Sequence, residues 1–543
     1  MKKKIITLIT ALILALSVLV GCSGYSKVKV SKEFELTKDD YEYTVRSNGG
    51  NAVQYGQYVY FINGYRGYDD TDGKNNVFGK VVKGALYRAK LVGVKEDRDF
   101  TVDFDKDTGL NFVSKKGKVH AYLGTDATED DEEVDIVDVQ LVAPKVIGTS
   151  GYTKGGGIYI YDEYVYYASP NNTKNKSGTV QVNKTDFFRT KLDGSKTQLL
   201  FTTEEDAADK PYAFYKQGDS VFLVCYYGTK IVSVKVTGDK KPGKAMLLTD
   251  DATSVLFPVK DTYNSKENVT NSLEDFIYYT RAVTEDDLQR AGNVVVVMRP
   301  DGSERFNFLM NGETVTLESV SGDALFYRTT DVNGNTSIIM DNLHDVLMDE
   351  GVDENGKEYK NSPSYKAYED EIKKEDETKA RFQVTSTILT STSMSDYTSL
   401  YCFRDNIYTN VGYIIALRSS TVELISNGSQ NYRILNEMAT LEFIQGNYMY
   451  YMDSDGTTLK RIDFTSAGNE SETIAKSVNT GGLGADYVAG MVMYFGKVDD
   501  WADGYAFFKN VGVEGAEAVA VYDRAVADRK VVEDETEDAT DSE

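Results

Sequence analysis

Histidine is almost absent from this sequence, with 2 among 543 residues, which excludes metal centres and catalytic triads built on several imidazole groups. Cysteine is also rare, and 3 residues cannot make a disulfide framework. Basic residues are outnumbered, with 60 Lys and Arg against 85 Asp and Glu. The resulting net charge of −25 argues against a nucleic-acid partner, because neutralising phosphates requires clustered basic side chains.

Motifs that identify catalytic chemistry are missing as well. No serine-hydrolase elbow, zinc-protease helix or nucleotide-binding loop is present. The best metal candidate is Asp103, Asp105 and Asp107, because alternating carboxylates can surround a hard cation such as Ca²⁺. However, Gly109 comes one position too late for an EF-hand loop, and Ser114 stands where that loop needs Glu. We therefore expect no cofactor, with weak Ca²⁺ binding at the three aspartates as the alternative.

The N-terminal residues contain a long apolar run. Three lysines precede an apolar stretch over residues 5–20, which is short for a membrane span of about 20 residues but suits a signal peptide. The stretch ends in Val20-Gly21-Cys22 and resembles the lipobox of bacterial lipoproteins. That resemblance implies removal of the leader at 1–21, lipidation of Cys22 and a place at the outer face of the cytoplasmic membrane. An uncleaved single-pass anchor is the alternative.

Short aromatic runs recur along the rest of the chain, which has 39 tyrosines. Tyrosine favours half-buried strands, and repeats of strand-type units at a period near 40 to 57 residues are typical of propellers. The runs begin at positions 58, 164, 221, 276, 324, 406, 448 and 491. We predict an all-β chain with a single β-propeller over residues 51–525. It has about eight four-stranded blades, or alternatively seven, with polar inserts at 93–135 and 345–390.

The repeating unit resembles that of TolB-like and low-density-lipoprotein-receptor-type propellers. An aromatic strand such as Tyr278-Tyr279-Thr280 leads to a second strand that ends near Arg299 and a following Asp-Gly. The resemblance implies the propeller fold and little about chemistry. Lipoproteins with such domains are found in Gram-positive bacteria, mostly as domains of unknown function.

The flanking segments have simpler interpretations. Residues 22–50 are expected to form a tether and a first strand. The C-terminal segment 526–543 should be an acidic disordered tail, since residues 533–543 contain seven acids and no Lys or Arg. Cys225 and Cys402 lie in strand-like aromatic runs and are expected to be buried free thiols, with one disulfide as the alternative.

These features favour a non-catalytic function. We expect a lipid-anchored binding or scaffolding module of the cell envelope, whose partner is a protein, a peptide or a glycan. The alternative is a glycan-active enzyme with paired carboxylates at the propeller channel, because propellers host such sites and 85 acids offer many pairs. A solute-capture lipoprotein is disfavoured, since no alternation of strands and helices is visible.

Overall fold

The computed structural model describes residues 28–29 and most of residues 43–520. Within that range the structure leaves out residues 57, 65–76, 79–80, 83, 95–98, 103–109, 116–117, 124–138, 151–154, 175–179, 261, 267–272, 286, 288–290, 309–312, 322–323, 343–380, 383–386, 391–396, 405–411, 427–430, 479–482, 497–504 and 517. The leader, Cys22, the three candidate calcium-binding aspartates and the acidic tail therefore lie outside the described residues.

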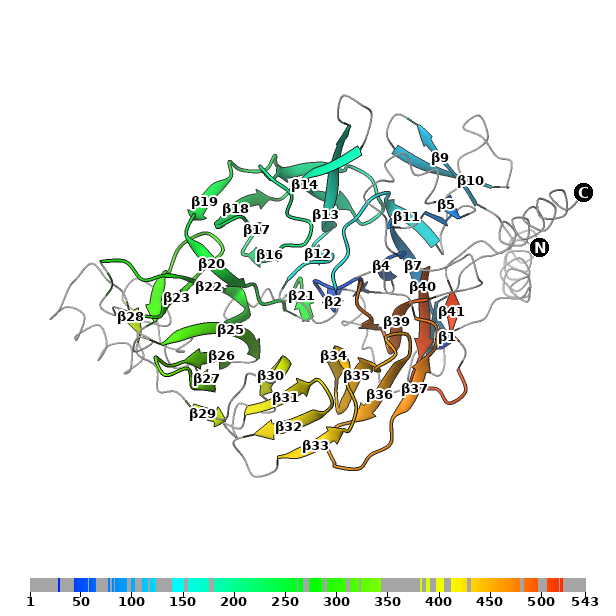
Figure 1. Ribbon diagram of the computed structural model, residues 1–543. Helices are drawn as coiled ribbons and strands as arrows, with labels where there is room; N and C mark the ends of the chain where they lie inside the picture. Colours follow the sequence, from blue (N-terminus) through cyan, green and yellow to red (C-terminus); the bar gives the residue numbers. More distant parts are fainter. Residues whose placement is uncertain are drawn as a thin grey trace, which may run out of the picture.

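Eight sheets, antiparallel except for one short pairing, form a ring around a central axis, and each of the eight is one blade (Figure 1). Blade 1 contains β3 (Ala52–Tyr55), β4 (Tyr58–Ile62), β7 (Leu86–Val94) and β11 (Val139–Ala143), and its sheet also includes β2 (Thr44–Arg46) and β21 (Thr262–Asn264). Blade 2 contains β12 (Tyr159–Tyr161), β13 (Tyr164–Lys174), β14 (Val180–Lys191) and β15 (Gln198–Thr202). Blade 3 contains β16 (Tyr212–Gln217), β17 (Ser220–Tyr227), β18 (Lys230–Thr237) and β19 (Met246–Thr249). Blade 4 contains β20 (Ala252–Leu256), β22 (Ile277–Ala282), β23 (Asn293–Met298), β24 (Phe306–Phe308) and β28 (Arg381–Phe382).

The second half of the ring repeats this plan. Blade 5 contains β25 (Thr314–Ser321), β26 (Ala324–Thr330), β27 (Thr336–Asn342) and β29 (Thr387–Thr390). Blade 6 contains β30 (Tyr397–Arg404), β31 (Gly412–Arg418), β32 (Val422–Ser426) and β33 (Tyr432–Leu435). Blade 7 contains β34 (Thr440–Gln445), β35 (Tyr448–Met452), β36 (Leu459–Asp463) and β37 (Glu472–Ala475), and blade 8 contains β38 (Asp486–Val488), β39 (Met491–Gly496), β40 (Tyr505–Asn510) and β41 (Val519–Ala520). The prediction of an eight-bladed, all-β propeller is confirmed.

Most of the repeated aromatic runs form the second strand of a blade, not the first strand that the sequence pattern suggested. The run at 58–61 is β4, for example, and a shorter strand nearer the axis, β3, pairs with it. The turn between the two strands explains the glycines that precede the runs, because Gly218 and Gly446 have positive φ angles of 54° and 55°. The run expected to begin at 406 lies outside the described residues, and β31 is the second strand of blade 6.

The aromatic runs form the core between blades. Tyr60, Tyr87, Tyr159, Tyr278 and Tyr450 are each at most 1% exposed. Both faces of a blade are covered by its neighbours, so the runs are apolar on both sides. Cys225 and Cys402 are buried free thiols, which confirms that expectation.

Four arginines lie in a third strand or directly after one, and each packs on an aromatic ring of its own blade. Each guanidinium lies over an aromatic ring at 4.3 to 4.8 Å from the ring centroid. The pairs are Arg88 with Tyr58, Arg189 with Tyr164, Arg299 with Phe276, and Arg461 with Tyr448. Arg189 in blade 2 also donates hydrogen bonds to the carbonyls of Gly238 and Lys240 in blade 3, at 2.6 and 2.8 Å. These contacts hold the arginines within the fold.

The ring closes where blade 8 meets blade 1, and the two sheets share none of the described strands. The carboxylate of Asp486 accepts hydrogen bonds from the backbone N–H groups of Asn51 and Ala52, the latter at 3.1 Å. The buried side chain of Asn51 donates to the carbonyls of Thr149 and Gly484 at 2.8 and 3.1 Å. Side chains in place of a shared strand thus fasten the first blade to its neighbours.

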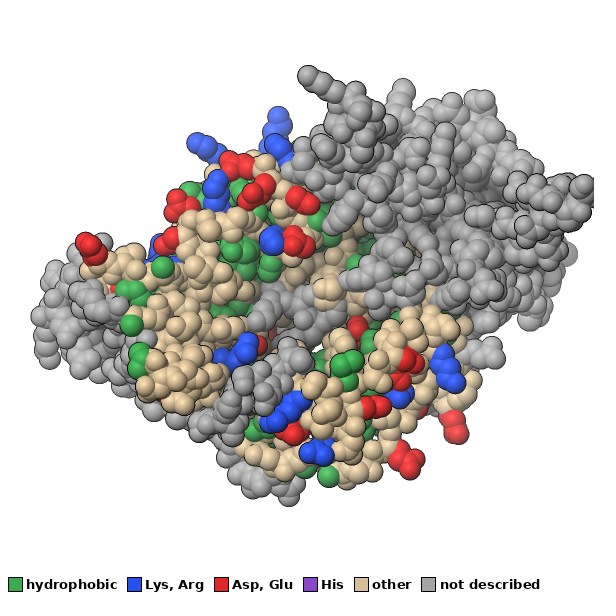
Figure 2. All heavy atoms as spheres, viewed as in Figure 1, with side chains coloured by type: hydrophobic (Ala, Val, Ile, Leu, Met, Phe, Trp, Pro, Cys, Tyr) green, Lys and Arg blue, Asp and Glu red, His purple; other side chains and the backbone are tan. Residues whose placement is uncertain are grey.

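The ranges predicted as polar inserts also contain strands. The first includes β8 (Asp99–Val102), which pairs with β7 and with β1 (Val28–Lys29), and the hairpin of β9 (Leu110–Lys115) and β10 (Lys118–Leu123). A second small hairpin, β5 (Val77–Phe78) with β6 (Val81–Val82), precedes it. The second range includes β28 and β29, of which β29 is the outermost strand of blade 5. Figure 2 shows charged side chains of both signs on this face of the described residues, at the outer edge and also nearer the centre.

Candidate ligand-binding cavity

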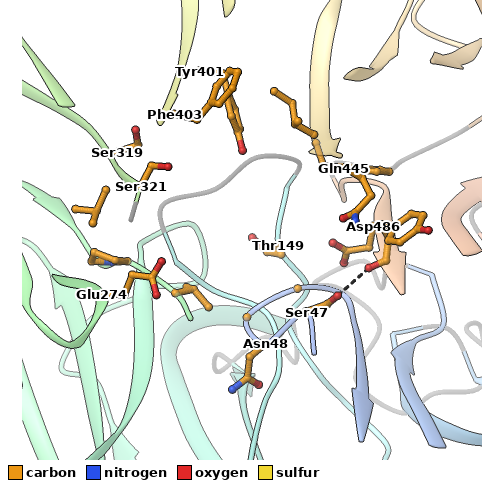
Figure 3. Close-up of a pocket in the computed structure, with 18 of the residues that line it drawn as sticks. Ser47, Asn48, Thr149, Glu274, Ser319, Ser321, Tyr401, Phe403, Gln445 and Asp486 are labelled. Carbon is orange, nitrogen blue, oxygen red and sulfur yellow. Dashed lines mark hydrogen bonds between the residues drawn. The ribbon is translucent and has the colours of Figure 1, made fainter. Parts of the chain in front are cut away.

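A cavity of about 630 Å³ lies where the inner strands of the blades approach the axis. Its lining comes from β25, β30, β34 and β38, from the segment that joins β2 to β3, and from the short 3-10 helix η2 (Leu273–Asp275). Figure 3 shows Glu274, Ser319 and Ser321 on one side and Gln445 and Asp486 on the opposite side. Cavities of this size accommodate small molecules or the end of a longer ligand.

Two glutamates reach the cavity from equivalent positions of two blades. In β25 the pairing with β26 shifts between Leu317 and Ser319, so Glu318 is the extra residue of a β-bulge. In β34 the same shift occurs between Leu441 and Phe443, so Glu442 occupies the bulge. A bulge changes the direction of a side chain that would otherwise point to alternate faces of the sheet like its neighbours. Bulges are common next to functional sites.

The two glutamates differ in what neutralises them. The Glu318 carboxylate is 7% exposed and pairs with the Arg328 guanidinium, with an Nε–Oε1 distance of 2.6 Å. Glu442 is 5% exposed, and its Oε2 accepts the backbone N–H of Ala485 at 2.8 Å. No ion pair to Glu442 occurs among the described residues, and burial raises the pKa of its carboxyl.

The other two carboxylates of the lining are Glu274 and Asp486. Asp486 contributes to the closure of the ring, because its carboxylate accepts hydrogen bonds from two backbone N–H groups of blade 1. Glu274 is the middle residue of η2 and is half-buried. Against these four carboxylates, the described residues of the lining include one basic side chain, Arg46, so this part of the cavity wall is acidic.

Aromatic rings make up much of the remaining wall. Tyr401 and Phe403 from β30 lie close together in Figure 3, with ring centroids 5.8 Å apart. Phe443 and Tyr487 come from blades 7 and 8, with ring centroids 6.4 Å apart. Hydroxyl groups also line the cavity, and that of Ser319 donates a hydrogen bond to the carbonyl of Cys402 at 2.8 Å. The cavity therefore combines acidic groups with aromatic walls.

Sequence reasoning did not single out the residues of this cavity. Cys22 and the candidate calcium ligands Asp103, Asp105 and Asp107 lie outside the described residues. Where the structure describes the chain, no group of three or more His, Cys, Asp or Glu side chains is arranged to hold a metal ion. In that same part, no helix has the length and apolar character needed to cross a membrane.

The fold and the cavity together define the class of this chain, an eight-bladed β-propeller with an acidic and aromatic cavity on its axis. No protein-family model matches the chain, and no curated protein sequence matches it.

Several solved structures resemble the chain at low identity. The nidogen/laminin complex has 11% identity and a TM-score of 0.27, and the match covers 53% of this chain and 89% of that chain. Prolyl oligopeptidase B from Galerina marginata has 10% identity and a TM-score of 0.35, covering 88% of this chain and 55% of that chain. An uncharacterized protein from Listeria monocytogenes has 10% identity and a TM-score of 0.30, covering 64% of this chain and 88% of that chain. Because these values are low, the propeller assignment depends on the sheets of this chain.

Proposed function

We propose that this chain is a lipid-anchored, non-catalytic binding module at the outer face of the cytoplasmic membrane. Its axial cavity receives the end of an envelope peptide, protein segment or glycan. The leader and Cys22 supply the anchor, and the net charge of −25 favours a domain that stands off an anionic lipid surface.

The cavity is the observation that carries this proposal. Its volume of about 630 Å³ suits one or a few residues or sugar rings and is too small for a folded partner. Two of its carboxylates already have structural tasks, since Glu318 pairs with Arg328 and Asp486 holds the ring closed. Because these two carboxylates are engaged in contacts within the fold, a binding function is favoured over acid–base catalysis, which requires carboxylates that are available to a substrate.

Filling the cavity tests the proposal. Fragments of the native envelope, both peptides and glycans, are titrated into the purified chain and followed by its thermal stability. The variant S321W/Q445W places two indoles on opposite sides of the cavity and should abolish the stabilisation that a ligand gives to wild type. The control variant V332W/M438W adds the same rings at exposed positions outside the lining and should keep it. Equal responses of the two variants, or no fragment that binds wild type, would contradict the proposal.

The anchor has its own test in the native host. The variant C22A should appear in the medium or accumulate with its leader, whereas wild type should stay with the membrane fraction and carry an acyl mass at its N-terminus. Release of wild type without a lipid would contradict the anchored placement.

A glycan-active enzyme is the second candidate. Glu318 and Glu442 favour it, because both occupy bulges beside the cavity and burial raises the pKa of Glu442, as a general acid requires. Hydrolysis of an envelope polysaccharide by wild type, lost in both E318Q and E442Q, would replace the binding module with this candidate.

A further inference from the structure

Glu442 is a buried carboxylate that forms no ion pair with any basic side chain of the described residues. Its side chain lines the axial cavity at 5% exposure, and its one hydrogen bond within the described residues is the 2.8 Å contact from Ala485 N–H to Oε2. The other oxygen, Oε1, has no partner there. A buried charge without a partner is costly, so the carboxylate is expected to be neutralised by something that enters the cavity.

The charge of the lining points to a positive ligand. Among the described residues of the lining, four carboxylates face one arginine, and Glu442 has no ion pair within the described part of the chain. A low-dielectric cavity of one sign concentrates ions of the opposite sign. An anionic or strongly acidic ligand is therefore disfavoured.

The walls distinguish an organic cation from a metal ion. Ca²⁺ requires six to eight oxygen ligands, and the described residues provide no cluster of three acidic side chains arranged for it. Aromatic faces such as those of Tyr401, Phe403 and Tyr487 attract ammonium groups, and the apolar side chains of Val320 and Ile444 suit an alkyl chain. A flexible alkyl chain with an ammonium end matches this lining, as in the side chain of lysine.

We propose that the axial cavity binds an alkylammonium group and that Glu442 forms the ion pair with it. This inference rests on the proposed binding function and names the chemistry of the ligand. The buried position of Glu442 on its bulge then has a purpose, because removal from water strengthens an ion pair once the ligand completes it.

The test compares three probes that differ in charge but not in length: pentylamine, 1-pentanol and pentanoate. Their binding to the full chain is measured by calorimetry and by nuclear magnetic resonance. Pentylamine should bind best, and the variant E442Q should weaken it by about tenfold or more while leaving 1-pentanol unchanged. The control variant E472Q removes an exposed carboxylate outside the lining and should change neither. A second variant, E274Q, keeps the test informative if E442Q folds poorly, and it should weaken pentylamine to a smaller extent.

The source of the ammonium group is resolved with larger probes. In one comparison, binding of a tripeptide with blocked ends and a central Lys is measured against binding of the same peptide with norleucine in place of Lys. In the other, binding of glucosamine is measured against binding of glucose. Preference for the Lys peptide identifies a peptide ligand, and preference for glucosamine identifies a glycan.

Two results separate the inference from the function on which it rests. Equal binding of pentylamine to wild type and to both glutamine variants would overturn the ammonium site, while S321W/Q445W could still abolish binding of an envelope fragment and support the cavity as a binding site. If S321W/Q445W still binds both pentylamine and the envelope fragment, the binding function of the cavity itself is overturned.

Discussion

Replacing Asp486 with alanine should open the ring at the junction of blades 8 and 1. The carboxylate accepts hydrogen bonds from the backbone N–H groups of Asn51 and Ala52, which begin the inner strand of blade 1. Hydrogen bonds to a charged group contribute about 1.5 to 3 kcal/mol each, and the lower value applies because the side chain is half-buried. The two bonds together stabilise the closed ring by about 3 kcal/mol.

That energy converts to a modest shift in melting temperature because the domain is large. Unfolding entropy is about 2.1 cal/mol/K per residue, or roughly 1 kcal/mol/K for a propeller of about 450 residues. D486A should therefore lower the melting temperature by about 3 °C. Hydrogen exchange gives the sharper assay, since amides of β3 and β38 should lose protection before those of blades 4 and 5.

The matched control is D463A. Asp463 also accepts two hydrogen bonds, but both come from Thr465 in its own turn, at 2.9 Å from the backbone N–H and 2.5 Å from the hydroxyl. Its loss should change stability by about 0.5 kcal/mol or less, as for most surface positions. Equal shifts for D486A and D463A, or uniform loss of protection around the ring, would refute the closure argument.

Other contacts yield independent predictions. R189A should destabilise the fold by about 3 to 5 kcal/mol in denaturant melts, and R189K should not rescue it, because Arg189 is 2% exposed and spans two blades through a planar fork. G157A should be far more destabilising than G446A, since a Cβ on Gly157 would meet a backbone oxygen of blade 1 at 2.4 Å whereas one on Gly446 meets nothing within 4 Å. The Arg281 guanidinium holds the pKa of Asp287 below its usual value, so this pair should stabilise the fold above the ordinary carboxyl range and lose that contribution as pH falls. D287N should remove that acid-dependent step from a plot of stability against pH.

Sequence patterns predicted the second and third strands of several blades well. Runs such as 276–279 are continuously apolar and aromatic because both faces are buried, and their partners were identified from the next apolar run. The inner strands were missed because some are short, such as Asp486–Val488, and because they contain polar residues. Eight units could be counted from the aromatic runs even though the inner strands were not recognised.

The cavity could not be predicted in the same way. Glu318 and Glu442 are 2 acids among 85, and nothing in their local sequence marks a bulge. Their shared location emerges only when the strands are paired, since a bulge is a property of two strands. Asn51 likewise looks like an ordinary turn residue, although its side chain is buried and joins segments about 98 and 433 residues away in the chain.

Glu442 connects stability with the proposed binding. Burial raises the pKa of its carboxyl, so the folded chain binds more protons than the unfolded chain above the ordinary value of 4.5, and stability falls as pH rises through that window. An ionised Glu442 in the empty cavity therefore opposes folding at pH 7. Glutamine retains an acceptor for the Ala485 N–H and removes the charge, so E442Q should melt at a higher temperature at pH 7. If the carboxylate had a purely structural role, E442Q would instead lower the melting temperature. A variant that is more stable but no longer binds the ammonium probe therefore identifies Glu442 as a ligand-binding group.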